Sequence, residues 1–291
     1  MRRKPGQAPK EQRHLIIPLL FWAFSGIADA APLLYVSSDQ RQFGVVDLAT
    51  GAYTHRGFTP DVLVGLGIND GTLYAIDTAD RFVSINPANA ATTVIGATGI
   101  TGSSPIPGFG AVAYFTSLAS AGLFAFDWSN NLYSVNSDTG AAALVGPTGV
   151  PRISGPFASI AAAGDANSLY LLIEEVSDPD LTTVIPGSLY RINPQTGAST
   201  LITDGLPELP FGGAGFANGA MFAFRNSLGG ILPPPQIWEL DPSNGAVLSI
   251  VDQDPALGDV FGAAQAPIPE PGSMMLVSMA MAALAWRGKR K

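Results

Sequence analysis

The most constraining feature of this chain is a phrase that occurs five times. Each copy has an apolar or aromatic pair, a short alternating strand, an Asn or Asp, and a Gly or Ala four residues later. The copies are Phe43–Gly51, Phe82–Ala90, Leu132–Gly140, Leu189–Gly197 and Ile237–Gly245. Asn or Asp caps a turn, Pro presets φ at the next position, and Gly accepts a left-handed conformation. Each phrase therefore predicts a hairpin, which we favour over a row of metal ligands.

The spacing of the phrases indicates how much chain belongs to each. Successive turn residues stand 39, 50, 57 and 48 positions apart, about the length of a four-stranded propeller blade. One such stretch divides into strands at 62–67, 72–77, 81–86 and 92–96, and the same order recurs from Phe109, Phe157 and Phe211. The first strand of each is rich in Gly and Ala, as the crowded wall of a central channel requires.

The two ends of the repeat region complement one another. The first copy, Leu33–Gly57, lacks an inner strand, and a Phe-led strand, Phe261–Gln265, stands alone at the far end. We expect residues Asp259–Gln265 to supply the missing inner strand and remove the open sheet edges. The prediction is an all-β fold, a five-bladed β-propeller with terminal-strand closure. Its Leu-Tyr-x-Ile-Asn phrases resemble those of bacterial surface propellers. A β-sandwich is the alternative, but it does not explain the repeat.

The C-terminus carries a three-part signal. Pro269, Glu270 and Pro271 precede the apolar run Ser273–Trp286, and a basic tail follows. The tail residues are Arg287, Lys289, Arg290 and Lys291. This resembles the PEP-CTERM sorting signal of Gram-negative bacteria, which implies processing by an exosortase on a protein bound for the cell surface or extracellular matrix. The apolar run predicts a short transmembrane helix, with the basic tail in the cytoplasm. The alternative is an ordinary C-terminal anchor.

The N-terminus agrees with export. A basic segment precedes the apolar core Leu15–Ile27, and Ala28-Asp29-Ala30 fits a cleavage site, so the mature chain should begin at Ala31. A retained membrane helix is the alternative. The predicted organisation is a signal peptide over 1–30, a propeller over 31–267 and a sorting signal over 268–291. The expected route runs from an inner-membrane precursor to the cell surface or matrix.

The charge balance excludes several classes of function. The chain has a net charge of −8 and each terminal signal carries +3, which leaves −14 on the body. Such a body repels nucleic acid and anionic lipid. The body has no lysine, the chain has no cysteine, and His55 is the body's one histidine, expected at the surface. Schiff-base and thiol catalysis are therefore excluded there, and no catalytic residue is predicted.

The longest connections should share one face of the ring, because they follow the second and fourth strands of the blades. They are 97–108, 146–155, 175–187, 225–235 and 252–258. Unequal loops on a rigid scaffold are where binding usually occurs, although these loops could also be tolerated insertions. The candidate ligand-binding residues on this face are Trp128, Glu174, Glu175, Asp178 and Asp180. Trp128 could stack on a sugar or cap the core.

Two further chemistries remain open for the acidic residues. Asp178 with Asp180, and Asp252 with Asp254, could bind Ca²⁺, the one cofactor considered. Paired carboxylates at the channel mouth could instead run glycoside hydrolysis or lyase chemistry. A mouth lined by Gly, Ala and Ser would favour binding. We therefore predict a non-catalytic binding or matrix module, whose partners are an exosortase-type enzyme and an extracellular polysaccharide or another envelope protein.

Overall fold

The computed structural model describes residues 32–266 apart from 103, 105–108, 121, 152–158, 175–186, 208–210, 228–229 and 231–232. Twenty strands and one 3₁₀ turn, η1 (Pro255–Leu257), make up these described residues. None of the helical segments in them is long and apolar enough to cross a bilayer. The described part is therefore all-β.

The strands form five antiparallel units of four strands each. The first unit contains β20 (Val260–Gln265), β1 (Leu33–Ser38), β2 (Gln42–Asp47) and β3 (Tyr53–Phe58). The second contains β4 (Leu63–Asn69), β5 (Thr72–Asp77), β6 (Arg81–Ile85) and β7 (Thr92–Ala97). The third contains β8 (Val112–Leu118), β9 (Gly122–Asp127), β10 (Asn131–Val135) and β11 (Ala142–Pro147). The fourth contains β12 (Ser159–Gly164), β13 (Leu169–Glu174), β14 (Gly187–Ile192) and β15 (Ser199–Leu206), and the fifth β16 (Phe211–Ala217), β17 (Ala220–Arg225), β18 (Gln236–Leu240) and β19 (Val247–Asp252).

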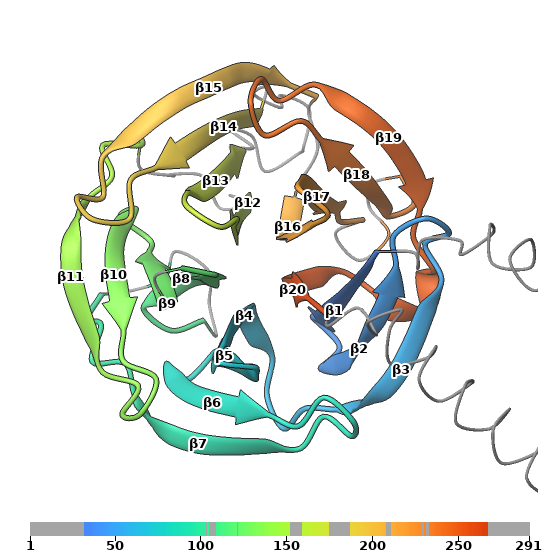
Figure 1. Cartoon of the computed structure of the whole chain (residues 1–291). Coiled ribbons are helices and arrows are strands. Elements are labelled where there is room, and N and C mark those ends of the chain that lie inside the picture. The colour runs from blue at the N-terminus through green and yellow to red at the C-terminus, as the bar shows by residue number, and fades with distance from the viewer. Residues whose placement is uncertain are drawn as a thin grey trace, which may run out of the picture. The chain divides into compact units, whose positions relative to one another are not determined.

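The units stand around a common centre, with β20, β4, β8, β12 and β16 innermost (Figure 1). Each inner strand contacts the inner strands of both neighbouring units, so the ring closes. The approach is close enough to exclude side chains: a Cβ on Gly65 would lie 2.1 Å from the Phe115 carbonyl oxygen. Gly65 and Phe115 also form a parallel bridge that joins the second and third units into one sheet. The expected Gly- and Ala-rich inner strands are confirmed for β12, β16 and β20, whereas β8, Val112–Leu118, contains one Ala and no Gly.

The core is divided among the spaces between units. Five buried clusters occur in the described residues, one between each pair of neighbouring units. Phe82 and Phe115, for example, meet edge-on between the second and third units, with ring centroids 5.9 Å apart. Full burial of a side chain of this size contributes roughly 1.5–3 kcal/mol. The ring is therefore stabilised mainly by contacts between units that are distant in sequence.

The predicted closure is confirmed. β20 pairs antiparallel with β1, with Leu34 opposite Gln265 and Val36 opposite Ala263. Val260 and Ala263 are buried with Leu34 between the fifth and first units. The last described strand thus completes the unit that the first described strand begins.

The five repeated phrases form the predicted turns between third and fourth strands. In each, the Oδ1 atom of the Asn or Asp accepts a bond from the backbone N–H two residues on, at 2.8–3.0 Å. The four glycines, Gly51, Gly140, Gly197 and Gly245, have φ of 73–78°, and Ala90 has φ of 62°. The turn interpretation is therefore confirmed for these residues.

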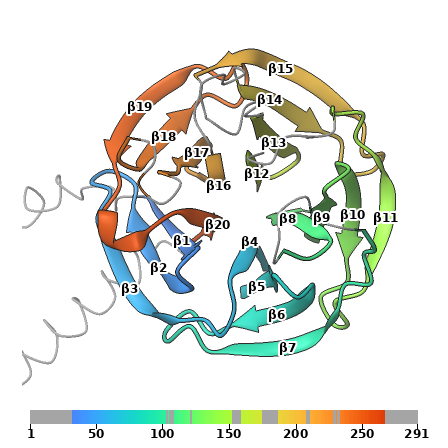
Figure 2. The same cartoon turned by 180° about the vertical axis from the view of Figure 1, so that it is seen from behind.

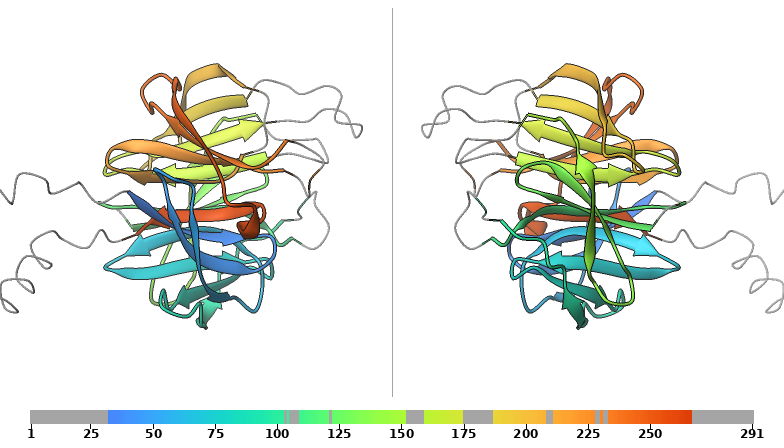
Figure 3. Two further views of the ribbon diagram at one scale, coloured as in Figure 1. Left: turned by 90° about the vertical axis from the view of Figure 1, so that its right-hand side faces the viewer. Right: turned by 90° about the vertical axis from the view of Figure 1, so that its left-hand side faces the viewer.

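The ring has two distinct faces. The inner strands end on the face where the described chain begins and ends, and there the Ala266 N–H donates to the Leu33 carbonyl at 3.1 Å. We call this the terminal face, and it is towards the viewer in Figure 1. The opposite side, the loop face, carries the connections that enter the inner strands, η1 among them (Figure 2). Figure 3 shows the ring edge-on, between the two faces.

Candidate functional site

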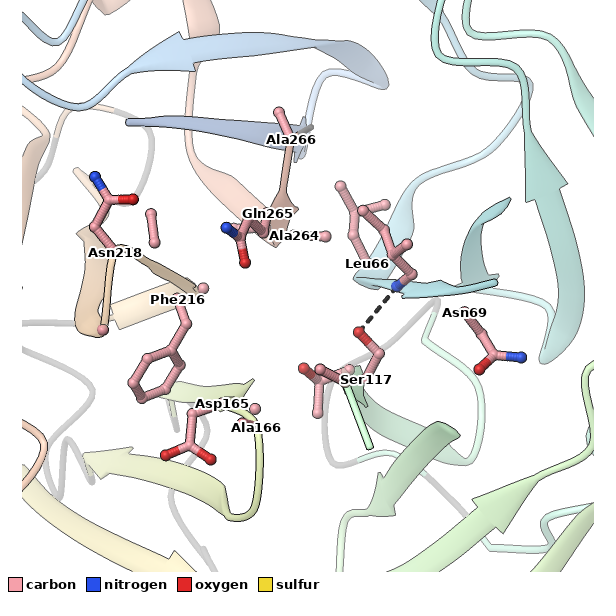
Figure 4. A pocket seen from close by; sticks show the side chains of 18 of the residues that line it. Leu66, Asn69, Ser117, Asp165, Ala166, Phe216, Asn218, Ala264, Gln265 and Ala266 are labelled. Carbon is pink, nitrogen blue, oxygen red and sulfur yellow. Dashed lines mark hydrogen bonds between the residues drawn. The ribbon is translucent and has the colours of Figure 1, made fainter. Parts of the chain in front are cut away.

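A central cavity of about 830 Å³ lies at the terminal face. It is lined by the ends of β4, β8, β12, β16 and β20 and by the turns that follow them, so every unit contributes. Each unit also contributes at least one polar residue to the lining, among them Asn69, Ser117, Asp165, Asn218 and Gln265 (Figure 4). Asn218 and Gln265 are exposed at the mouth. The cavity is large enough for a ligand of ordinary small-molecule size.

The wall of the cavity is made of small residues because the inner strands converge. A Cβ on Gly164 would lie 2.1 Å from the Ser117 carbonyl oxygen, and one on Gly215 would lie 3.1 Å from Leu34. The Ser117 hydroxyl accepts a bond from the Ile68 N–H at 2.9 Å, which ties the third unit to the second (Figure 4). The wall presents backbone and small side chains, with Leu66, Ile68 and Phe216 as its larger apolar members.

The carboxylates of the cavity close turns. Asp165 Oδ1 accepts bonds from the N–H groups of Asn167 at 2.6 Å and Ser168 at 2.7 Å, and Oδ2 accepts one from the Tyr170 hydroxyl at 3.2 Å. Burial and the nearby Asp165 carboxylate raise the pKa of Tyr170. The Tyr170 ring packs against Phe216, with centroids 5.1 Å apart. Asp165 is thus held by its own turn and by a neighbouring phenol.

The charge of the lining has one sign. Asp70 and Asp165 are its two acidic residues, and no Lys, Arg or His is among the described residues that surround the cavity. Asp70 adopts a left-handed conformation, with φ of 48°, in the turn after β4. An anionic ligand would meet no compensating charge here, a cationic ligand would meet two carboxylates, and a neutral ligand requires no compensating charge.

The segment that follows the cavity carries the most specific sequence signal. Residues 267–291 match the model of the PEP-CTERM protein-sorting motif. The chain therefore ends in a PEP-CTERM sorting motif. The match confirms the sorting interpretation and begins one residue before the predicted boundary at 268. A PEP-CTERM motif is a substrate signal for exosortase-type processing and indicates an exported protein.

The other comparisons concern the body. No curated protein matches the chain in sequence. Among solved structures, a calcium-binding protein, regucalcin from Agrobacterium tumefaciens, shares 15% identity at a TM-score of 0.43, over 78% of this chain and 72% of that one. Ycf48 bound to a D1 peptide shares 11% identity at a TM-score of 0.38, over 77% of this chain and 68% of that one. Both are β-propeller proteins.

Trp128 was a candidate ligand-binding residue that could either stack on a sugar or cap the core, and the structure favours the second alternative. The residue is only 7% exposed. Its Nε1 donates to the Gly110 carbonyl at 3.0 Å, and its ring meets Phe109 edge-on at 6.4 Å. Because the ring faces are covered by the core between the third and fourth units, Trp128 caps that core and is not free to bind a sugar.

Of the four acidic candidates, the structure describes only Glu174, and it does not line the cavity. Glu174 is the last residue of β13, a strand whose first residues follow the cavity turn at Asp165, so its backbone lies at the loop-face end. Glu175, Asp178 and Asp180 lie outside the described residues. So do the PEP-CTERM residues and the predicted signal-peptide residues Ala28, Ala30 and Ala31.

In the described part of the chain, no group of three acidic or His side chains could hold a metal ion. The structure therefore offers no support there for the predicted calcium site. The Asp252 carboxylate accepts a bond from Gln236 Nε2 at 3.1 Å, and that of Asp254 accepts one from the Ala256 N–H at 2.9 Å. His55 is exposed on β3, as expected.

Sequence reasoning missed the cavity residues because it used loop length as the signal. The longest connections are on the loop face, but the cavity lies among the shortest turns. A usable signal was present: a polar residue follows the Gly- and Ala-rich inner strand in several units, as in Gly215-Phe216-Ala217-Asn218. Residues that follow converging strands must lie close to the ring axis.

Proposed function

We propose that this protein is an exported, exosortase-sorted, five-bladed β-propeller whose body, residues 31–267, is a non-catalytic binding module of the cell surface or matrix. The observation that carries the proposal is the cavity at the terminal face. It combines a wall of converging inner strands, rich in Gly and Ala, with at least one polar residue from each of the five units. Few precisely placed polar groups on a preformed concave surface are typical of a binding site.

The chemistry of the lining favours a neutral, hydroxyl-rich ligand. The amides of Asn69, Asn218 and Gln265 can each donate and accept hydrogen bonds, as sugar hydroxyls require. The two carboxylates and the acidic body disfavour anionic polymers. The proposed ligand is therefore a neutral segment of extracellular polysaccharide.

Glycoside hydrolysis is the less favoured function. It requires one carboxylic acid that donates a proton and a second carboxylate at a defined separation. In the cavity, Asp165 accepts two hydrogen bonds within its own turn and a third from the Tyr170 hydroxyl of β13, so both of its oxygens are used in structural contacts. Asp70 lies in a tight turn and accepts only a long bond, 3.4 Å, from Asn69 Nδ2. These contacts support a binding role.

The sorting steps complete the proposal. Removal of residues 1–30 and export would leave a precursor held in the inner membrane by the apolar run Ser273–Trp286. The basic residues Arg287, Lys289, Arg290 and Lys291 would stay in the cytoplasm. Processing at Pro269-Glu270-Pro271 would then release the body or transfer it to the surface.

Sorting is tested by fractionating an exosortase-carrying Gram-negative host and measuring the mass of the surface form. We expect that form to lack the basic tail, and Glu270→Ala to trap the precursor in the inner membrane. Glu239→Ala, in β18, is the matched control and should be processed normally. A surface form that retains the tail would show that the segment is only an anchor.

Binding is tested with the purified mature protein and polysaccharides of known charge. We expect a neutral polymer to bind and a uronic-acid polymer to bind weakly or not at all. Gln265→Ala should weaken binding by roughly fivefold, the loss of about one hydrogen bond. Gln40→Ala, an exposed glutamine on the loop face, should change nothing. Release of new reducing ends would instead establish an enzyme, and binding only to envelope proteins would overturn the polysaccharide assignment.

A further inference from the structure

We propose that the C-terminal tether holds the cavity against the membrane in the precursor, so that processing is what opens the site to polymeric ligands. The inference rests on the proposed function and adds a regulation of the same site. Its starting observation is that the last described residue, Ala266, is itself part of the cavity lining.

The exit point of the chain is fixed. Ala266 is buried, and its N–H donates to the Leu33 carbonyl at 3.1 Å. Gln265 pairs with Leu34 in the closing sheet. The chain therefore leaves the ring from the edge of the cavity and cannot peel away without opening the first unit.

The tether is short. Six residues, 267–272, separate Ala266 from the start of the apolar run at Ser273, and three of them are prolines. At 3.3–3.6 Å per residue, Ala266 and Ser273 can be at most about 25 Å apart. The prolines also restrict the conformations of this segment and of the residues before them.

The body is too large to turn around on such a tether. A compact domain of this length has a radius of gyration of about 18 Å, which corresponds to roughly 45 Å across. The path from the ring centre, around the rim, to the loop face exceeds about 25 Å on that scale. The loop face therefore cannot turn towards the bilayer for as long as the apolar run stays in it, and the edge of the cavity at Ala266 stays within about 25 Å of the start of that run.

The consequence differs for small and large ligands. Small solutes can diffuse through the gap, but the nearby bilayer obstructs a polysaccharide chain or a folded protein that approaches along the ring axis. Asp70 and Asp165 at the mouth also repel anionic headgroups, so the face lies near the membrane without inserting into it. The loop face is accessible before and after processing.

Because the chain has no cysteine, a single introduced cysteine is the one thiol that a maleimide can label. Ala119→Cys places a thiol at an exposed position of the cavity lining, and Ala79→Cys places one at an exposed turn of the loop face. Each variant of the full chain is labelled with a small maleimide and with a polymer-linked maleimide, after removal of the outer membrane. The unprocessed form comes from cells that lack the exosortase, and the processed form from cells that have it.

We expect polymer labelling at position 119 to be several-fold slower in the unprocessed form, with small-maleimide labelling unchanged. Position 79 should react equally in both forms. A long Gly/Ser spacer inserted after Ala266 should restore polymer labelling of the unprocessed form, because a flexible linker frees the body to rotate. Equal polymer labelling at position 119 in both forms would overturn the proposal. Shielding at position 119 in a protein whose mature form binds no polysaccharide would leave the orientation standing and remove the binding function.

Discussion

Aspartates cap turns on both faces of the ring, but only on the terminal face do those turns border the central cavity. On the loop face, Asp77 accepts bonds from the N–H groups of Ala79 and Arg81, both at 3.0 Å, and pairs with the Arg81 guanidinium. On the terminal face, Asp165 caps its turn in the same way, but the turn borders a cavity. The difference shows that a turn carboxylate lines the central cavity when its turn lies where the inner strands converge. The length of the loop that carries it matters less.

The geometry of the ring produces this asymmetry. The connections that enter β8 and β12 on the loop face are long, whereas the inner strands leave through short turns on the terminal face. Short turns hold their polar residues close to the axis, where every unit contributes to the lining of the cavity. Long connections carry their residues away from it. The site therefore arises from repetition of the unit, without a local motif.

The largest change in stability is expected when β20, the strand that closes the ring, is removed. A chain that stops after Leu257 loses β20, including the buried Val260 and Ala263, and exposes the edge of β1. We expect its free energy of unfolding in urea to fall by about 4 kcal/mol or more relative to a chain that stops after Ala266. Equal stability of the two truncated chains would mean that pairing of β20 with β1 does not stabilise the ring or its terminal face.

A second test probes the wall shared by both faces. Gly65 has φ of 132° and no room for a Cβ, whereas Gly71, in the exposed turn after β4, has φ of 75° and nothing within 4 Å of that position. Gly65→Ala should cost at least about 2 kcal/mol, and Gly71→Ala about 1 kcal/mol. Urea unfolding of both variants measures the difference. Equal costs would show that the inner strands are not in tight contact.

The sequence predicted what local chemistry and repetition determine. The expected strand at 72–77 is β5 residue for residue, and closure by 259–265 is correct to within one residue. Trp128 shows what could not be predicted: its burial depends on Phe109 and Gly110, almost twenty positions earlier, across the third unit. The cavity likewise depends on how closely five separate strands converge. The separations between these strands depend on how neighbouring units pack, and the sequence of one segment does not determine that packing.

A third test asks whether the terminal-face carboxylate is structural. Asp165→Ala removes three hydrogen-bond acceptor contacts from the turn after β12, so the free energy of unfolding should fall by about 1–2 kcal/mol. Asp138→Ala, at an exposed turn position of the third unit, is the control and should stay within about 0.5 kcal/mol. Loss of ligand binding in Asp165→Ala with no loss of stability would instead make Asp165 a ligand contact.

The smallest expected effect lies on the loop face, where two acids meet at the closing seam. Burial and the charge of Asp259 raise the pKa of Asp39 above its ordinary 3.8. Asp39 also accepts a bond from the Asp259 N–H at 3.1 Å. Because the folded state holds this proton more tightly than the unfolded state, the stabilisation is present below about pH 3.8 and is lost as the pH rises through the raised pKa. Asp39→Asn keeps an acceptor for the N–H and removes the charge.

The variant should therefore be slightly more stable than the wild type at neutral pH, with the gain disappearing in acid. Asp39 is exposed, so solvent screening limits the gain to a few tenths of a kcal/mol. Urea unfolding at neutral and acidic pH, at low and high salt, measures it, and high salt should reduce it further. Asp138→Asn, at a turn position of the third unit, is the charge-matched control. A variant less stable than the wild type at neutral pH would show that the Asp39 carboxylate contributes more through its hydrogen bond than it loses to Asp259.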